Sequence, residues 1–401
     1  MTQIIFGEHD EQTLVQLRDV ASRAERTALM ADGHLGYVMP IGGVAAYRNA
    51  VSVVGVGFDI ACGNAAIRTD LKRDNLEDLS ALADEIQHTL SFGIGRKNRD
   101  DDAPVGHPLF ESAAWQAVPG EERHRLRERA REQLGTVGSG NHYVDIFVDE
   151  SDAVWVGVHF GSRGFGHTVA SGFLALGQNM PWRMRAPERE VLLPLDSALG
   201  DAYWQLMNLA GEYAYAGREW VARRVVQLLG GEELELVHNH HNFAWPEEHG
   251  GESYIVVRKG ATPAWPGQRS FIGGSMGDSS FIVSGAESPT DEATRDQQER
   301  AMFSTVHGAG RVMSRTKAAG KRKRKTGQII SPGVVSPEMM HGWLAQQGVI
   351  LRGGGLDESP HVYRRLPDVL AAQGDTIAIE HELRPLIVVM AGAKEFDPYK
   401  D

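Results

Sequence analysis

The sequence contains a single cysteine, Cys62, among 401 residues. A lone thiol excludes a disulfide framework within the chain, so the chemistry open to it is metal binding or nucleophilic attack, although most lone cysteines are buried and inert. No run of about 18 apolar residues is present, which is the length that a membrane-spanning helix needs. The N-terminal stretch, MTQIIFGEHDEQ, has acidic residues where a signal peptide carries a basic start and an apolar centre. These absences predict a cytoplasmic protein.

Positive charge is also scarce, because 53 acidic side chains outnumber 41 lysines and arginines and the formal net charge is −12. Nonspecific binding to nucleic acid requires clustered cations, so this balance argues against a protein that holds nucleic acid by bulk electrostatics. One local exception is the run of five cations at Lys321–Lys325. Because like charges repel, this run is expected to be solvated, either as an exposed loop or as a contact for a polyanion.

The apolar content of 42% is ordinary for a soluble globular chain and is enough for a sizeable core. Length alone suggests about two to three domains. The chain has no internal repeat at solenoid spacing and no long linker rich in proline or serine. One interleaved domain over residues 1–401 is therefore predicted.

Hydrophobic periodicity predicts where helices and strands lie. Helical spacing occurs in three segments: Glu11–Met30, Glu121–Leu134 and Ser197–Leu229. Strands are predicted over short apolar or alternating runs, at Val51–Val56, Asn64–Leu71, His142–Val148, Ala153–Phe160, Glu233–Phe243, Ser253–Ala261 and Ser280–Gly285. A turn is expected at Gly57–Gly63, which places Cys62 at a strand end.

Four segments share one arrangement, in which a strand delivers a metal-type or nucleophilic side chain to its end and glycines crowd beside it. They are GFDIACG with Asp59 and Cys62, GSGNHYVD with Asn141, His142 and Asp145, VHFGSRGFG with His159 and Arg163, and HNHHNF with His238, His240 and His241. A carboxylate, a thiolate and several imidazoles suit a borderline divalent ion such as Mn²⁺, Zn²⁺ or Fe²⁺ better than Ca²⁺. No CxxC or HExxH spacing supports this ligand set, so satisfied core histidines remain the alternative.

A fifth segment, STVHGAGRVMSRTK, places His307 between an apolar run and a Gly-Ala-Gly turn that three cationic side chains follow. Small residues let a bulky ligand approach the backbone, and arginines suit phosphate oxygens, which favours a phosphate-handling histidine. The alternative is a strand that ends at a glycine turn, with a solvated basic helix beyond it. The segment alone does not decide between the two.

Eight motifs occur in order along the chain: ADGHLG, GVGFDIACG, LGTVGSGNHYVDI, VHFGSRGFG, HHNF, RKGA, GGSMG and HGAGRVMSRTKA. Together they resemble the RtcB family of RNA ligases, and the resemblance extends from about Asp32 to the C-terminal LRPLIVVMAG. It implies an α+β fold, with a mixed or antiparallel β-sheet core flanked by helices and a metal site at the strand ends. It also implies ligation by way of a histidine that carries GMP.

The resemblance assigns a metal site to residues at the matching positions. The family's GVDIGCG is similar to GFDIACG here, so Asp59 and Cys62 are expected to be ligands, with the thiolate bridging two Mn²⁺ ions. His142 of GNHY would join them on one ion. His159 of VHFGSRG and His241 of HHNF would complete the other ion with Cys62.

His307 of HGAGR matches the family's nucleophile, which attacks the α-phosphate of GTP and carries GMP. The resemblance then implies that a 2′,3′-cyclic phosphate is hydrolysed to a 3′-phosphate, that this phosphate attacks the histidine-bound GMP, and that a 5′-hydroxyl displaces GMP. The expected nucleotide contacts are Asn141, Asn242, Ser275, Gly308, Ala309, Gly310 and Tyr363. The expected contacts to RNA phosphates are Arg163, Arg315 and Lys317.

The sequence departs from the family pattern around the nucleotide base. The usual family chain ends in Val-Lys-Gly, whose lysine touches guanine, whereas Met390 or Ala391 stands at that place here. Lys394, further along, is the residue that would have to reach back. Asp145 replaces a glutamate, VYRR at 362–365 replaces AYKD, and AGKRKRKTGQ replaces a segment rich in Gln and Asp. The changes spare the metal ligands and the nucleophile, so nucleotidyl transfer is predicted to survive.

Three functions follow as hypotheses. The first is an RNA ligase that joins 3′-phosphate or 2′,3′-cyclic phosphate ends to 5′-hydroxyl ends with GTP and Mn²⁺, in RNA repair or tRNA splicing. The second is a nucleotidyltransferase that caps 3′-phosphate ends of RNA or DNA with guanylate and does not ligate efficiently. The third is a non-catalytic, metal-dependent RNA-binding protein. The resemblance also raises an archease-type activator as a partner.

Overall fold

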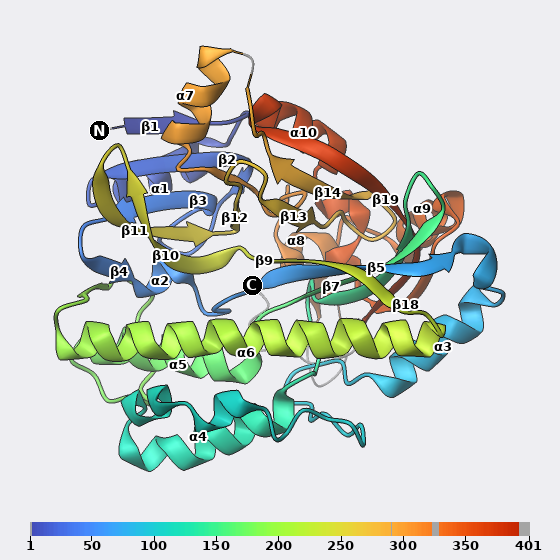
Figure 1. Cartoon of the computed structure of the whole chain (residues 1–401), viewed down its shortest axis with the longest axis horizontal. Helices are drawn as coiled ribbons and strands as arrows, with labels where there is room; N and C mark the ends of the chain where they lie inside the picture. The colour runs from blue at the N-terminus through green and yellow to red at the C-terminus, as the bar shows by residue number, and fades with distance from the viewer. Residues whose placement is uncertain (1, 290, 323–328, 393–401) are drawn as a thin grey trace.

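The computed structural model describes residues 2–289, 291–322 and 329–392 (Figure 1). The described chain combines helices with a large, mostly antiparallel sheet, which confirms the predicted α+β fold class. Among the described residues, no helix is both long enough and apolar enough to cross a bilayer. The predictions for Lys323–Lys325 and Lys394 lie outside the described residues.

The larger sheet has eight strands. They are β5 (Gly63–Lys72), β6 (Tyr143–Val148), β7 (Ala153–Phe160), β9 (Glu233–His240), β13 (Arg269–Ile272), β14 (Ser280–Gly285), β18 (Ile350–Gly354) and β19 (Ile377–Gly392). The order is β13–β14–β19–β6–β7–β5–β9, with β18 parallel to β19 and all other neighbours antiparallel. Both β6 and β7 are buried along their whole length, because both faces of the sheet are covered at its centre.

The smaller sheet has five strands. They are β1 (Thr2–Ile5), β2 (Arg26–His34), β3 (Ile41–Tyr47), β10 (Asn242–His249) and β11 (Glu252–Lys259), in the order β1–β2–β3–β11–β10. Because β9 ends at His240 and β10 begins at Asn242, the chain crosses from one sheet to the other at His241. A predicted metal ligand therefore lies at the junction of the two sheets.

Three further strand pairs complete the β structure. They are β4 (Ala50–Ser52) with β8 (Leu192–Pro194), β12 (Ala261–Pro263) with β15 (Ser304–Val306), and β16 (Gly320–Arg322) with β17 (Ile329–Pro332). The β15 strand leads directly to His307, so the segment does end a strand at a glycine turn. The strand places that histidine beside the smaller sheet, because β15 contacts β2.

The longest helix, α6 (Ala198–Leu229), lies along one face of the larger sheet and contacts β5 and β7 (Figure 1). Ser197 caps its start by accepting from the Gly200 N–H, and Gly230 ends it in the left-handed region at φ 72°. The other helices are α1 (Glu11–Ala21), α2 (Val53–Val56), α3 (Leu79–Thr89), α4 (Gly120–Gln133), α5 (Arg163–Leu176), α7 (Glu292–Arg300), α8 (Arg315–Ala319), α9 (Pro337–Gln347) and α10 (Leu366–Gln373). In Figure 1, α5 and α4 lie along α6 on the side away from the smaller sheet's outer strands.

Two of the predicted elements are wrong. The segment Glu11–Met30 is helical only to Ala21, and Arg26 onward belongs to β2, where an unbroken run of buried residues suits a strand covered on both faces. The segment Val51–Val56 is a strand only to Ser52, whose Oγ accepts from the Gly55 N–H and caps α2. The cap overrides the strand preference of the valines.

Candidate active site

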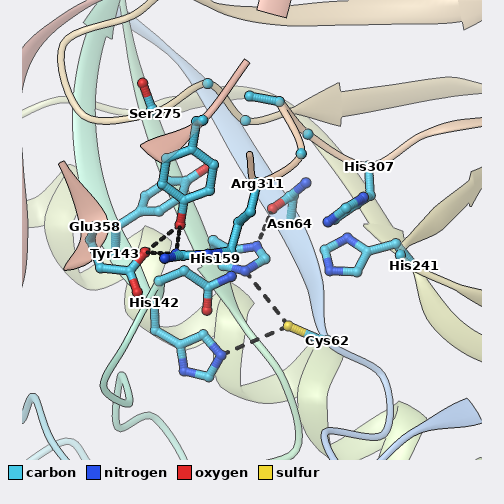
Figure 2. Close-up of a pocket in the computed structure, with 18 of the residues that line it drawn as sticks. Cys62, Asn64, His142, Tyr143, His159, His241, Ser275, His307, Arg311 and Glu358 are labelled. Atoms are coloured by element: carbon cyan, nitrogen blue, oxygen red, sulfur yellow. Dashed lines mark hydrogen bonds and ion pairs between the residues drawn. The ribbon is translucent and has the colours of Figure 1, made fainter. Parts of the chain in front are cut away.

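A cavity of about 310 Å³ lies between the two sheets (Figure 2). Its walls come from β5, β6, β7 and β19 of the larger sheet and from β2, β3 and β10 of the smaller sheet. The loops before β5 and after β15 also line it. The cavity therefore collects residues from segments that lie far apart in the sequence.

The first group of possible metal ligands is Asp59, Cys62 and His142. His142 Nε2 lies 3.1 Å from Asp59 Oδ2 and 3.8 Å from Cys62 Sγ. A glycine is required beside the carboxylate, because a Cβ on Gly161 would lie 2.3 Å from Asp59 Oδ1. Although burial opposes ionisation, the hydrogen bond and charge of His142 lower the pKa of Asp59 to about 2. This acid is therefore an anionic ligand at neutral pH.

The second group is Cys62, His159 and His241. Cys62 Sγ lies 3.7 Å from His159 Nε2, and the His159 and His241 rings stack with their centroids 5.2 Å apart. His159 Nδ1 donates to Asn64 Oδ1 at 2.7 Å, which directs Nε2 toward the thiol. Cys62 belongs to both groups, which is the position predicted for a bridging ligand.

The chemistry of both groups fits a divalent metal ion. Burial raises the pKa of the Cys62 thiol, and a bound cation reverses that preference by stabilising the thiolate. Burial lowers the pKa of His159 and His241, which keeps both imidazoles neutral, the form that binds metal. Nδ1 of His142 and Nδ1 of His241 are buried and have no hydrogen-bond partner within the described chain. Such O, S and N donors suit a borderline ion.

His307 follows β15, and its ring lies in the same cavity close to His241 (Figure 2). His307 Nδ1 lies 2.5 Å from Asp32 Oδ2, and the His307 and His241 ring centroids are 4.9 Å apart. The same Asp32 oxygen accepts from the backbone N–H groups of His307 at 3.0 Å and Gly308 at 3.3 Å. Asp32 is fully buried in β2, so its carboxylate fixes both the ring and the turn that follows.

All seven residues predicted to contact the nucleotide line this cavity, namely Asn141, Asn242, Ser275, Gly308, Ala309, Gly310 and Tyr363. Gly310 has φ 71°, and a Cβ there would lie 2.3 Å from the Asp32 carbonyl oxygen, so only glycine fits. Asn242 Oδ1 accepts from a backbone N–H at 2.7 Å, and Ser275 Oγ donates to Asp278 at 2.7 Å. The structure thus brings these residues together beside His307, while their contacts with a nucleotide stay predictions.

A family model described as tRNA-splicing ligase RtcB matches residues 14–391. The chain belongs to the RtcB family. It is 31% identical to the RNA-splicing ligase RtcB of Escherichia coli strain K12, over 94% of this chain and 93% of that protein. It is also 31% identical to the tRNA-splicing ligase RtcB of Thermococcus kodakarensis, over 92% of this chain and 88% of that protein. The resemblance predicted from the ordered motifs is confirmed.

Of the three RNA contacts predicted for this RtcB-family chain, only Arg315 is among the described residues that line the cavity. Its Nη1 lies 2.6 Å from Glu358 Oε1 and 3.7 Å from Asp357 Oδ2, and both acids are buried. Arg163 donates at 3.2 Å to a threonine hydroxyl and at 3.2 Å to a backbone carbonyl. Lys317 is exposed on α8. Arg163 and Arg315 both lie against the turn before β6, because a Cβ on Gly138 would lie 2.4 Å from Arg163 Nη1 and one on Gly140 would lie 2.9 Å from Arg315 Nη1. Contacts of the three cations with RNA stay predictions.

Strands β6 and β19 of this RtcB-family fold form a further part of the cavity wall, and Figure 2 shows Tyr143 of β6 on the other side of His159 from His307. Tyr143 pairs with Met390 and Asp145 with Val388 across these strands. Met390 lines the cavity, at a place where the resemblance predicted a lost lysine. The Tyr143 hydroxyl and Asp145 Oδ1 are buried without hydrogen-bond partners among residues 2–289, 291–322 and 329–392. Burial raises the pKa of Asp145 well above its usual value.

Several residues at the site have no role in the sequence-based prediction. Asp32 holds His307, Asn64 orients His159, and Glu358 accepts from the Tyr363 hydroxyl. Asp32 falls within the ADGHLG motif, so its presence in an ordered family motif was the available signal. Asn64 carries no comparable signal, because its partner His159 is 95 residues away. Glu358 lies five residues before Tyr363 but falls in none of the ordered motifs.

Proposed function

We propose that this protein is an RNA ligase that joins 3′-phosphate or 2′,3′-cyclic phosphate ends to 5′-hydroxyl ends, in RNA repair or tRNA splicing. It would use GTP, Mn²⁺ and a guanylylated histidine. The observation that carries the proposal is the position of His307, which Asp32 holds in the cavity that also receives both groups of possible metal ligands. Family membership and the names of the relatives, which are RNA- or tRNA-splicing ligases, support it.

His307 is suited to attack a phosphorus atom. Because the Asp32 carboxylate contacts Nδ1, that nitrogen carries the proton and the lone pair of Nε2 is left for attack. Attack on the α-phosphate of GTP forms an N–P bond and breaks the P–O bond to pyrophosphate, which leaves GMP on the ring. The carboxylate stabilises the positive charge that develops on the imidazole.

The two ligand groups would hold the Mn²⁺ ions, with Cys62 shared between them. Bound Mn²⁺ offsets the negative charge that builds on phosphoryl oxygens during transfer. The chain's own contribution is orientation, because Asn64 fixes the ring of His159 and the hydrogen bond to Asp59 fixes that of His142.

The later steps transfer GMP to RNA and then release it. A 3′-phosphate oxygen attacks the phosphorus of the bound GMP, which breaks the N–P bond and returns His307 to its free form. The 5′-hydroxyl then attacks the RNA phosphorus, GMP leaves, and a phosphodiester forms. A 2′,3′-cyclic end enters after water opens it to a 3′-phosphate. Gly308 and Gly310 keep the wall beside the ring free of side chains.

A second candidate function is guanylylation of 3′-phosphate ends of RNA or DNA without efficient ligation. The observation in its favour is that Arg315 already contacts two buried acids, Asp357 and Glu358, inside the cavity. An arginine held in this way is less available to position a second RNA end. Guanylylation itself needs only the nucleotide, the metal groups and His307.

A ligation assay separates these candidates. A labelled RNA with a 3′-phosphate is incubated with GTP, Mn²⁺ and an acceptor RNA with a 5′-hydroxyl, with His307→Ala as control. Product of the joined length supports the ligase, whereas accumulation of the guanylylated donor supports the capping enzyme. If neither forms but the RNA binds in a metal-dependent way, the non-catalytic hypothesis replaces both. Adding an archease-type protein tests whether an activator is needed.

A further inference from the structure

Arg218 is a fully buried arginine on α6 that lies behind the metal-ligand residues. Its Nη1 donates to the backbone carbonyl of Ala61 at 2.9 Å and to that of Phe160 at 2.6 Å. Its Nη2 donates to His240 Nδ1 at 2.8 Å, and its Nε donates to His238 Nε2 at 3.0 Å. A single guanidinium therefore joins the turn before β5 to the ends of β7 and β9 that face the cavity.

Three of the four acceptors stand next to a metal-ligand residue in the sequence. Ala61 precedes Cys62, Phe160 follows His159, and His240 precedes His241. These three ligand residues are the members of the second metal group. The other two ligand residues, Asp59 and His142, do not adjoin any of the four acceptors. The contacts of Arg218 thus adjoin every member of the second group but only Cys62, the shared member, of the first.

The packing around Arg218 leaves room for this side chain and for little else. Gly63 lets β5 and β9 approach closely at this point, because a Cβ there would lie 2.1 Å from the Asn239 carbonyl oxygen and 3.1 Å from Arg218 Nη2. Tyr215 stacks on His240 with ring centroids 3.8 Å apart, and the guanidinium lies 5.4 Å from the centre of the Tyr215 ring. These contacts hold the planar guanidinium of Arg218 in one orientation.

The hydrogen bonds also explain why the charge can be buried without a hydrogen-bonded carboxylate among its described partners. Backbone carbonyls and neutral imidazole nitrogens accept from it, and burial keeps His240 neutral by lowering its pKa. Lysine has one ammonium group and no planar fork, so it cannot reach the carbonyls of Ala61 and Phe160 together with a ring on β9.

We infer that Arg218 is a positioning residue that sets the spacing of Cys62, His159 and His241 and so determines the affinity of the second metal group. The inference deepens the proposed function, on which its catalytic relevance rests. Outer residues that orient metal ligands typically change metal affinity by about tenfold to a hundredfold when they are replaced. The predicted loss falls on the second group, and the group of Asp59, Cys62 and His142 is largely spared.

The test measures Co²⁺ and Mn²⁺ binding to the metal-free full-length protein, by titration calorimetry and by cobalt absorption. In a His142→Ala background, which leaves the second group, Arg218→Met is expected to weaken binding by about tenfold or more. In a His159→Ala background, which leaves the first group, the same change is expected to alter binding by no more than about twofold. Equal weakening in both backgrounds, or none in either, would overturn the inference.

Arg258 offers a matched control, because it is also a fully buried arginine but pairs with Glu247 on β10. Arg258→Met is expected to lower the melting temperature and leave the affinities of both metal groups unchanged. If Arg218→Met does not fold, Arg218→Lys, which keeps a buried cation, is used in its place. Metal binding is again expected to weaken only at the second group. A loss of metal affinity without any guanylylation in wild type would support Arg218 and contradict the proposed function, so the two outcomes are distinguishable.

Discussion

The two ends of the cavity differ in whether a charged partner holds their polar side chains, although both include buried polar atoms without hydrogen-bond partners among the described residues, such as Asp32 Oδ1 and the Tyr143 hydroxyl. At the end that holds His307, a buried carboxylate contacts the ring, and the second metal group lies beside it. At the end formed by β6 and β19, the Tyr143 hydroxyl and Asp145 Oδ1 have no hydrogen-bond partner in the part of the chain that the structure describes. The first end is organised before a substrate arrives, as electrostatic catalysis requires.

The contrast indicates which part of the reaction this chain shares with its family and which part it has changed. The resemblance predicts that the possible metal ligands and His307 are retained, and that Asp145 and either Met390 or Ala391 stand in place of the family's glutamate and lysine at the β6 and β19 end. A buried polar atom without a partner is costly until a ligand supplies one. The Tyr143 hydroxyl and Asp145 Oδ1 therefore favour nucleobase selection at the β6 and β19 end. We expect the transfer of GMP to take place at the end that holds His307.

Replacing Cys62 is expected to have the largest effect on the end of the cavity that holds His307. Because the thiol belongs to both metal groups, Cys62→Ala is expected to abolish binding of both ions, whereas His159→Ala is expected to retain one. Mn²⁺ bound per chain after dialysis, measured by elemental analysis, distinguishes the two. Retention of two tightly bound ions by Cys62→Ala would show that the cysteine is not shared.

Asp32→Asn tests the contact that holds His307. An amide cannot stabilise an imidazolium and favours the wrong tautomer of the ring, so guanylylation is expected to slow by about 10²- to 10⁴-fold. The rate of covalent labelling under single-turnover conditions measures this, and the bound Mn²⁺ should stay at the wild-type level. A labelling rate within a few-fold of wild type would rule out a role for the carboxylate in activating the ring.

Met390→Lys tests the changed end. A lysine at this position would place a cation and a donor at the cavity wall opposite Tyr143, at one of the two residues, Met390 or Ala391, where the resemblance places the family's lysine. The ratio of labelling with GTP to labelling with ATP is expected to rise by about tenfold, the size of one hydrogen bond to a charged group. Met390→Leu, which conserves shape and adds no donor, should leave the ratio unchanged. An unchanged ratio in the lysine variant would place base selection elsewhere.

The smallest predicted effect is on how the melting temperature depends on pH. Burial raises the pKa of Asp145, so above about pH 4 the folded protein keeps a proton that the unfolded chain releases. The contribution of Asp145 to the free energy of unfolding therefore falls as the pH rises toward the folded-state pKa, and Asp145→Asn removes that dependence. The melting temperature of the variant minus that of wild type is expected to increase between about pH 5 and pH 8.

Asp149 supplies the control for this pH series. Despite burial, hydrogen bonds from Trp155, Ser151 and nearby backbone groups lower its pKa, so it is ionised in both the folded and unfolded states over the same range. The melting-temperature difference for Asp149→Asn should therefore stay level there. A level difference for Asp145→Asn as well would show that this carboxyl finds a partner in solution.

The parts of the fold that the sequence predicts are those with a strong local pattern. The helix at Ser197–Leu229 and the strands around Phe147 and Trp155 have clear periodicity, and the structure confirms them as α6, β6 and β7. The helix expected to reach Met30 failed because local apolar spacing does not distinguish a buried strand from a helix. The one-domain organisation stays a prediction.

The residues of the site also divide into those that the sequence predicts and those that it does not. Motif order identified the family and so pointed to the cysteine, the histidines and His307, which the structure places in one cavity. The residues that hold them, such as Asp32 and Asn64, act through contacts across long sequence separations, 275 residues in the case of Asp32 and His307. Two of the four acceptors of Arg218 are backbone carbonyls, which leave no trace in side-chain motifs. Such contacts exist only once the sheets have come together.

The most direct test of the account is covalent label transfer from GTP labelled at the α-phosphate, in the presence of Mn²⁺, to wild type and to His307→Ala. The account predicts that wild type becomes labelled, that the alanine variant does not, and that the variant still binds Mn²⁺ at the wild-type level. Parallel labelling with ATP reports on the changed end of the cavity. Labelling of His307→Ala at the wild-type rate, or no labelling of metal-loaded wild type, would contradict the assignment of His307 as the nucleophile.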